Sequence, residues 1–152
     1  MAKIYLASSW RNPDQPRLVR LLREHGHEVY DFRNPPHGRG GFASWSDIDP
    51  DWLAWSAEAY RDALNSRTAR LGFGADFDGM KWADVGVLLL PSGRSAHLEA
   101  GFMAGAGKPV VLYTHDGQEP ELMALLLASI VINDAELIAR LREHDCALAV
   151  QP

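Results

Sequence analysis

The segment from residue 84 to residue 90 constrains the fold of this chain more than any other. It reads Asp-Val-Gly-Val-Leu-Leu-Leu, so that after the aspartate every side chain is apolar or absent. An apolar run of this length is typical of a central parallel strand that is covered on both faces. The segment therefore predicts an α/β protein built on a parallel sheet.

Strand-like and helix-like segments alternate along the rest of the chain. The expected strands are residues 3–7, 27–32, 84–90, 109–113 and 129–132. The expected helices are residues 13–25, 56–71, 76–82, 95–106, 120–127 and 134–143. We expect Asn12 to cap the first helix, Pro13 to open it, and Gly72 and Gly74 to separate the second helix from the third. Repeated strand, helix, strand units imply right-handed crossovers, and we predict five parallel strands in the order 2-1-3-4-5.

The strand order also predicts where a ligand binds. In open parallel sheets, ligands bind beyond the carboxyl ends of the strands, at the point where the strand order reverses. In this chain that point lies between the first and the third strand. It selects two loops, Ser8, Ser9 and Trp10 after the first strand and Pro91, Ser92, Gly93 and Arg94 after the third.

Size and composition narrow the class of protein. With 152 residues we expect one domain spanning residues 1–152, and Cys146, the only cysteine, cannot form an intrachain disulfide. The formal net charge of -5 argues against binding to nucleic-acid polymers or anionic membranes, because both need a positive field. The apolar run is far shorter than the ~20 residues that span a bilayer, and residues 1–10 do not resemble a signal peptide. We expect a cytoplasmic domain that acts on small molecules.

Glu99 is the first candidate for chemistry. It follows the loop after the third strand and lies within about a turn of the expected start of a helix. The free N–H groups and partial positive charge of a helix N-terminus favour an ionised carboxylate, which suits a nucleophile or an anion-binding site. Acids are also enriched in first helical turns, where they only complement the helix dipole. On position alone both interpretations stay open.

Five stretches of the chain form a recognisable set when they are taken in order. They are residues 4–7 (Ile-Tyr-Leu-Ala), Asp76 with residues 79–80, residues 83–84, residues 99–103 (Glu-Ala-Gly-Phe-Met) and residues 107–110 (Gly-Lys-Pro-Val). The set resembles the nucleoside 2-deoxyribosyltransferase family, including the related N-glycoside hydrolases of nucleoside 5′-monophosphates. The resemblance spans most of the chain and is weakest from Arg33 to Arg70. It implies a flavodoxin-like or Rossmann-like three-layer sandwich and cleavage of an N-glycosidic bond by double displacement.

The resemblance implies three catalytic roles. Glu99 matches the nucleophile that attacks the anomeric carbon of the sugar, with the logic of retaining glycosidases. Tyr5 matches a strand tyrosine that orients this nucleophile, and Asp76 matches the acid near the base, where a proton must reach the leaving nitrogen. The sugar then passes to another base in the transferases and to water in the hydrolases.

The residues before Glu99 depart from the transferase pattern. The transferases carry an acid a few positions before the nucleophile, where this chain has Ser92, Gly93, Arg94 and Ser95. Relatives that hydrolyse nucleoside 5′-monophosphates place a serine near this position for the phosphate. These side chains, together with the helix N–H groups, can form an anion cradle. Alternatively, Arg94 is solvated or pairs with an acid such as Asp84.

Aromatic residues near the expected site can stack on a nucleobase. The candidates are Trp10, Phe42 and Trp45, and such stacking contributes ~1–3 kcal/mol per base. The last two lie in an irregular stretch from residue 33 to residue 51, and loops of this length are typical of lids or binding loops. Each aromatic can instead serve only to pack this loop, and we assign Trp52 and Trp55 to the core.

No cofactor and no metal are expected. Four acidic residues have the spacing of a calcium loop, namely Asp47, Asp49, Asp51 and Glu58, but Trp52 occupies the position that requires glycine.

The resemblance implies a homodimer or higher homo-oligomer that acts on a nucleoside or nucleotide. Two other functions stay open: cleavage of a dinucleotide such as NAD, as in TIR-related enzymes, and nucleotide sensing without turnover.

Overall fold

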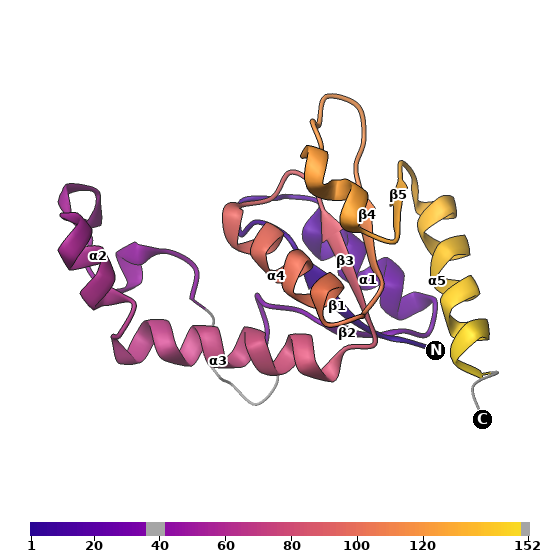
Figure 1. The fold of residues 1–152 in the computed structure, drawn as a ribbon, viewed down its shortest axis with the longest axis horizontal. Coiled ribbons are helices and arrows are strands. Elements are labelled where there is room, and N and C mark those ends of the chain that lie inside the picture. Colours follow the sequence, from indigo (N-terminus) through magenta and orange to yellow (C-terminus); the bar gives the residue numbers. More distant parts are fainter. Residues whose placement is uncertain (36–41, 150–152) are drawn as a thin grey trace.

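The structure, a computed structural model, describes residues 1–35 and 42–149. Its centre is an all-parallel sheet of five strands in the order β2-β1-β3-β4-β5 (Figure 1). The strands are β1 (Lys3–Ala7), β2 (Glu28–Tyr30), β3 (Val85–Leu89), β4 (Val110–Tyr113) and β5 (Ser129–Val131). The predicted α/β class and strand order are confirmed, and β3 is the central strand that the apolar run predicted.

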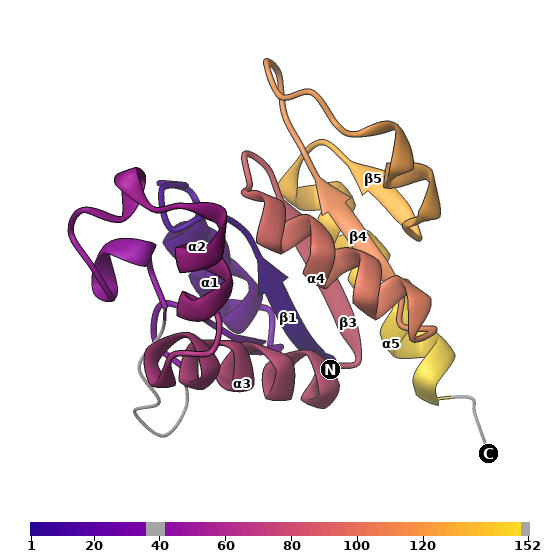
Figure 2. The same ribbon diagram turned by 60° about the vertical axis from the view of Figure 1, so that its left-hand side comes forward.

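Helices cover both faces of the sheet, so the fold has three layers (Figure 1 and Figure 2). On one face, α1 (Gln15–Glu24) and α5 (Asp134–Ala149) pack through leucines such as Leu22 and Leu141. On the other face, α3 (Arg67–Trp82) and α4 (Arg94–Gly105) pack through Met80 and Met103. The remaining short elements are η2 (Trp45–Asp47), η3 (Trp52–Ala54), α2 (Ala57–Ala63) and η4 (Leu122–Leu126).

The expectation that Gly72 and Gly74 separate two helices was wrong. Helix α3 runs through both glycines, and its start is set earlier by Ser66, whose side chain accepts a hydrogen bond from the Ala69 amide. A Cβ atom on Gly72 would lie 2.5 Å from Cβ of Phe42. Gly72 therefore permits close packing of another chain segment and does not end a helix.

Two other helix boundaries also differ from the expectation. Helix α1 begins at Gln15 and not at Pro13, and its N-cap residue is Asp14. Asn12 is buried, and its side-chain amide group bridges two loops that are described below, while its Oδ1 accepts a hydrogen bond from the amide of Asp14, the N-cap residue. Residues 120–127 hold the short 3-10 helix η4 in place of the expected α-helix.

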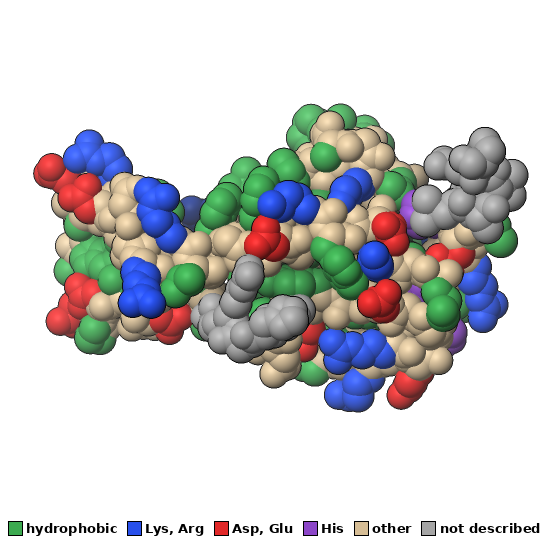
Figure 3. All heavy atoms as spheres, turned by 90° about the horizontal axis from the view of Figure 1, so that it is seen from below, with side chains coloured by type: hydrophobic (Ala, Val, Ile, Leu, Met, Phe, Trp, Pro, Cys, Tyr) green, Lys and Arg blue, Asp and Glu red, His purple; other side chains and the backbone are tan. Residues whose placement is uncertain are grey.

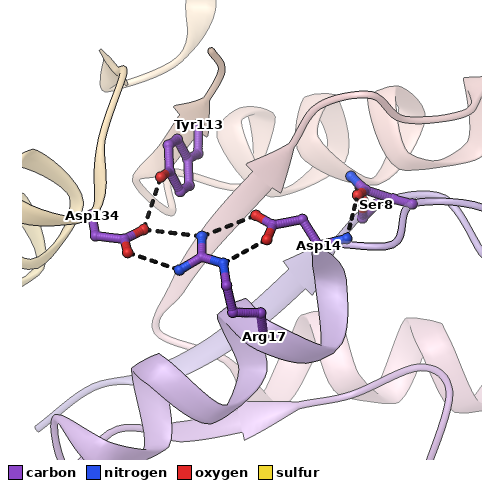
Figure 4. A network of polar contacts seen from close by, with 6 residues as sticks. Ser8, Asp14, Arg17, Tyr113 and Asp134 are labelled. Atoms are coloured by element: carbon purple, nitrogen blue, oxygen red, sulfur yellow. Dashed lines mark hydrogen bonds and ion pairs between the residues drawn. The ribbon is translucent and has the colours of Figure 1, made fainter.

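A polar network ties together the two helices of the first face (Figure 4). Arg17 of α1 donates hydrogen bonds to Asp14 and to Asp134 at the start of α5. Tyr113 of β4 also donates to Asp134, at 2.8 Å. Tyr113 belongs to the core on the α1 and α5 side of the sheet, so this network lies across the sheet from α3 and α4.

Residues 42–66 form an arm that stands off the sheet near the N-terminal end of α3 (Figure 1 and Figure 2). Edge-to-face contacts join four aromatic side chains within the arm, namely Phe42, Trp45, Trp55 and Tyr60. The assignment of Trp52 and Trp55 to the core was wrong, because both are only half-buried. The arm has an aromatic cluster of its own, which explains its high tryptophan content.

Charged side chains of both signs are interleaved on the face that Figure 3 displays. That face therefore carries no extended field of one sign. Among the described residues, no helix combines the length and apolarity needed to cross a bilayer.

Candidate active site

Two stacked tyrosines form the floor of the candidate site. Tyr5 of β1 and Tyr30 of β2 are register partners in the parallel sheet, so their side chains leave on the same face. Their rings stack with centroids 5.2 Å apart and an interplanar angle of 11°. Both side chains are almost completely buried. The two hydroxyl groups are therefore held at fixed positions beneath α3 and α4.

Tyr5 reaches Glu99 because α4 packs closely on the sheet. On its other side, Tyr5 is the register partner of Gly86 in β3. A Cβ atom on Gly86 would lie 3.1 Å from the sulfur of Met103, which shows how closely α4 approaches at this point. Glu99 lies one helical turn before Met103, on the same side of α4, and its carboxyl group is hydrogen-bonded to the Tyr5 hydroxyl.

Tyr30 reaches Asp76 because a glycine also lets α3 pack closely on the sheet. A Cβ atom on Gly79 would lie 2.7 Å from Cδ2 of Tyr30, so only a glycine lets α3 lie against this ring. Asp76 lies three residues earlier in the helix, and its Oδ1 accepts a hydrogen bond of 2.9 Å from the Tyr30 hydroxyl. Each carboxyl group is thus held by one tyrosine of the stacked pair.

Lys108 fixes the end of the helix that carries Asp76. Its ammonium group donates to the main-chain oxygens of Met80, Lys81 and Ala83, at 2.8, 2.7 and 2.6 Å. A cation at a helix C-terminus satisfies carbonyl groups that have no partner within the helix. This contact gives the Gly-Lys-Pro-Val stretch of the sequence a structural role at the site.

Burial shifts both carboxyl groups toward neutrality. It raises the pKa of Glu99 to about 7, with a further rise from the charge of Asp76, while the Tyr5 hydrogen bond opposes the shift. Burial likewise raises the pKa of Asp76 to about 6, against the effect of the Tyr30 hydrogen bond. The pKa values of Tyr5 and Tyr30 are raised by burial and by the nearby carboxylates, so both hydroxyls stay protonated and remain donors.

The shift of the Glu99 pKa is opposite in direction to the effect of a helix N-terminus. Helix α4 begins at Arg94, which places Glu99 in the second turn. The influence of the helix dipole is largely confined to the first turn. Desolvation and the like charge of Asp76 outweigh it.

Two adjacent carboxyl groups with pKa values near neutrality can share acid and nucleophile roles. One can act as an ionised nucleophile while the other holds a proton for a leaving group. The structure brings together the three residues to which the resemblance assigned catalytic roles, Tyr5, Asp76 and Glu99. Their roles in a reaction remain predictions.

The loop after β1 is held firmly in place. Ser8 donates to the main-chain oxygen of Leu89 at 2.9 Å and accepts from the Asn12 amide at 3.1 Å, and Asn12 also donates to the Pro91 oxygen. Ser9 accepts from the backbone of Arg11 within the same loop. These contacts connect the two loops that the strand order selected.

Trp10 lies at the rim of this loop and is partly exposed. Its ring meets Phe32 edge to face, with centroids 5.3 Å apart. Arg33 donates to the main-chain oxygens of Trp10 and Asn12, at 2.7 and 2.8 Å, which fixes the backbone behind the indole. The structure thus gives Trp10 a packing contact while leaving part of its ring accessible.

The loop after β3 leads into α4 with polar groups on its outer side. Gly93 is the N-cap residue of α4, and Ser92 lies 3.4 Å from the His97 ring. Arg94 and Ser95 are exposed, and Arg94 forms no ion pair with any residue in ranges 1–35 and 42–149. Pairing of Arg94 with Asp84 is not seen, because that carboxylate accepts from the Lys3 amide instead.

Phe42 and Trp45 pack within the arm. The ring centroids of Phe42 and Trp45 lie 5.0 Å apart, and Phe42 also rests on Gly72, one turn before Asp76 in α3.

Asp47 and Asp49 of the calcium-like pattern serve as hydrogen-bond acceptors for local amides and for the Trp55 indole. No group of residues suited to a metal ion occurs in the described part of the chain.

Tyr30 is the site residue that the sequence interpretation missed. From the sequence, Tyr30 is only one residue of the strand expected over residues 27–32. The available signal was its position: aligning residues 3–7 with residues 28–32 as neighbouring parallel strands pairs Tyr30 with Tyr5. Its link to Asp76 joins residues 46 positions apart and could not be read from local spacing.

No protein-family model matches the chain, and no curated protein matches it. Among solved structures it is similar to a 2-deoxyribosyltransferase from Bacillus psychrosaccharolyticus, with a TM-score of 0.59, 23% identity and 90% of each chain covered. The chain has the fold of a 2-deoxyribosyltransferase. The family resemblance indicated by the sequence is thus confirmed at the level of the fold.

Two further solved structures are similar to the chain. A conserved protein from Enterococcus faecalis V583 has a TM-score of 0.55 and 17% identity, covering 95% of this chain and 99% of that one. A CMP N-glycosidase, BcmB, from Clostridium botulinum has a TM-score of 0.49 and 16% identity, covering 91% of this chain and 97% of that one.

Proposed function

We propose that this protein cleaves the N-glycosidic bond of a nucleoside or nucleoside 5′-monophosphate through a covalent intermediate on Glu99. One observation carries the proposal: Glu99 and Asp76 are neighbouring carboxyl groups, and each is hydrogen-bonded to one of two stacked, buried tyrosines. Such a pair supplies the nucleophile and the acid that a double displacement at a sugar carbon needs. The fold shared with a 2-deoxyribosyltransferase supports this chemistry.

The first half of the reaction forms the intermediate. The reacting form has Glu99 ionised and Asp76 protonated, and it is populated beside the reverse form because the two pKa values, about 7 and about 6, lie close together. In this form the carboxylate of Glu99 attacks the anomeric carbon, and the bond from this carbon to the base nitrogen breaks. The electron pair of that bond goes to the base, and Asp76 supplies a proton to the base. Tyr5 orients Glu99 by its hydrogen bond to the carboxyl group.

The second half regenerates the enzyme. A second base or a water molecule attacks the same carbon, and the ester bond to Glu99 breaks with its electron pair returning to the carboxylate. The incoming nucleophile gives up a proton, which restores the acid form of Asp76. Transfer and hydrolysis therefore differ only in the acceptor.

We propose that residues in and near the loops after β1 and β3 contact the substrate. We assign Ser92, Gly93, Arg94 and Ser95 at the start of α4 to a 5′-phosphate or another acidic group, because this end of the helix offers N–H groups and an exposed cation. We assign Ser8, Ser9 and Trp10 to the sugar and base. Phe42 and Trp45 remain proposed base contacts, reached from the arm.

We also propose that the chain acts as a homodimer or higher homo-oligomer. Large apolar side chains are exposed on the face that carries α4 and η4, among them Leu98, Leu122 and Leu125. Helix η4 lies on this face because its Ala124 packs in the same core cluster as Met103. Large apolar side chains exposed together on one face are typical of a contact between proteins.

A product assay tests the proposed function. The protein is incubated with deoxynucleosides, deoxynucleotides, ribonucleotides and NAD, and free base is measured by liquid chromatography with and without an acceptor base. Release that requires an acceptor indicates a transferase, and release in water indicates a hydrolase. The variant Glu99→Ala should lose at least ~10³-fold in rate, since it lacks the nucleophile.

The matched control is Glu119→Ala, which removes an exposed glutamate and should keep the wild-type rate. A Glu99→Ala variant with the wild-type rate would contradict the covalent mechanism. Thermal stabilisation by a nucleotide without any base release would instead indicate a sensor.

A further inference from the structure

Tyr30 makes contacts that its position in the strand alone does not require. Its ring stacks on Tyr5 and fills the space that Gly79 leaves in α3. These contacts need only an aromatic ring, and phenylalanine would satisfy them. The hydroxyl group adds one interaction, a hydrogen bond of 2.9 Å to Oδ1 of Asp76.

We propose that Tyr30 is a positioning residue that holds Oδ1 of Asp76, so that the acid proton resides on Oδ2 and is aimed at the leaving base. This inference rests on the proposed function, because it specifies how that reaction obtains its proton. A carboxyl group carries its proton on one oxygen and accepts on the other. A donor fixed on Oδ1 therefore decides both which oxygen is acidic and how the group is oriented.

The surroundings of Asp76 make this contact decisive. Within residues 1–35 and 42–149, the titratable groups that act on Tyr30 and Asp76 are Tyr5 from β1, Glu99 from α4 and Asp31 beside Tyr30, and none of these three is a cation. Among the described residues, only the Tyr30 hydroxyl is seen to donate to the Asp76 carboxyl. A half-buried carboxyl that one side chain holds depends on that side chain for its orientation and for the stability of its ionised form.

The same deletion at another tyrosine supplies a matched control. Tyr113→Phe also removes a hydroxyl that donates to an aspartate, Asp134, but on the opposite face of the sheet. Tyr30→Phe keeps the stacked ring and the contact with Gly79, so the fold is retained. Comparing the two variants separates loss of a buried hydrogen bond from loss of control over Asp76.

The first measurement uses two substrates that differ in their need for an acid. A purine deoxynucleoside needs a proton on its leaving base, whereas its 7-methyl derivative releases a neutral base without one. Because general acid catalysis is worth ~10²–10⁴-fold, Tyr30→Phe should lower kcat on the ordinary substrate by at least about tenfold, with KM changed less than about twofold. On the 7-methyl substrate the loss should be less than about threefold.

The second measurement does not depend on turnover. The pKa of the Asp76 carboxyl is followed by carbon NMR in the wild-type protein, Tyr30→Phe and Tyr113→Phe. Because a hydrogen bond to the charged form favours that form, Tyr30→Phe should raise this pKa by about one unit and move the alkaline limb of the rate profile by the same amount. Tyr113→Phe should change neither.

The outcomes distinguish the two proposals. Equal losses on both substrates with an unchanged Asp76 pKa would overturn the role of Tyr30 while leaving the proposed reaction intact. Absence of base release by the wild-type protein from every nucleoside and nucleotide would overturn the proposed function itself. A loss confined to the ordinary substrate, together with a raised Asp76 pKa, supports the positioning role.

Discussion

At the scale of single residues, the site depends on which of two opposing effects controls the pKa of a half-buried acid. For Glu99, burial and the neighbouring charge of Asp76 raise the pKa, while the Tyr5 hydrogen bond lowers it. The first two effects are larger than the third, so the pKa of Glu99, about 7, lies well above its ordinary value of 4.5. The folded protein therefore holds the Glu99 proton more tightly than the unfolded chain does.

This difference predicts how stability depends on pH. The contribution of Glu99 to the free energy of unfolding is fully present below pH 4.5, falls as the pH rises toward 7, and stays low above pH 7. Glu99→Gln removes the titration while keeping an oxygen that can accept from Tyr5. At pH 8 this variant should be more stable than the wild type by on the order of 2 kcal/mol, or about 5 °C in Tm, with little difference at pH 4.5.

Thermal unfolding at several pH values checks this prediction, with Glu119→Gln at an exposed position as the control. The control should follow the wild-type curve throughout. An advantage for Glu99→Gln that stays constant with pH would show that its cause is packing and not ionisation.

The sequence predicted three of the four residues at the centre of the site, and the reason for the omission is physical. Glu99, Asp76 and Tyr5 belong to stretches that resemble a known family. Tyr30 becomes a site residue only through two contacts between elements, its stacking on Tyr5 and its hydrogen bond to Asp76. Such contacts depend on strand register and helix placement, which residue types do not encode locally.

At the scale of elements, glycines decide how closely the helices approach the sheet. From the sequence, Gly72 and Gly74 are expected to separate two helices, because glycine lowers helix propensity. Tertiary packing overrides that preference in α3, where Gly72 receives Phe42 and Gly79 receives the Tyr30 ring. The strand order, by contrast, follows from the alternation of elements and the crossover rule, and it was predicted correctly.

Two identical substitutions in α3 should therefore have opposite effects. Gly79→Ala places a methyl group 2.7 Å from the Tyr30 ring, which must displace the helix or the ring. We expect a loss of about 1–3 kcal/mol in unfolding free energy from this overpacking, together with slower base release. Gly74→Ala meets no atom of the described residues within 4 Å and should stabilise the protein by about 0.5–1 kcal/mol through helix propensity alone.

Denaturant unfolding of both variants, combined with the base-release assay, checks this pair. The contrast is internal, because the same change is made five positions apart in one helix. Equal stability changes at the two positions would mean that the approach of α3 to Tyr30 does not limit the residue at position 79.

At the scale of the whole molecule, apolar side chains are exposed in two places, on the face of α4 and η4 and in the arm. The face of α4 and η4 exposes Leu125 at 81%, and the arm exposes Leu53 at 79%. The two residues match in type and exposure, but only the first lies on the face proposed as the contact between copies. The pair therefore tests the site of assembly and not merely its existence.

The mass in solution, measured by light scattering after size exclusion, should be at least twice the 16.8 kDa of one chain. Leu125→Glu should shift this mass toward that of a single chain, because a carboxylate buried in an apolar contact without a partner costs several kcal/mol. Leu53→Glu, with its added charge in the arm, should leave the mass unchanged. Dissociation by Leu53→Glu alone would move the contact to the arm, and a wild-type protein that elutes as a single chain would remove the assembly from the proposal.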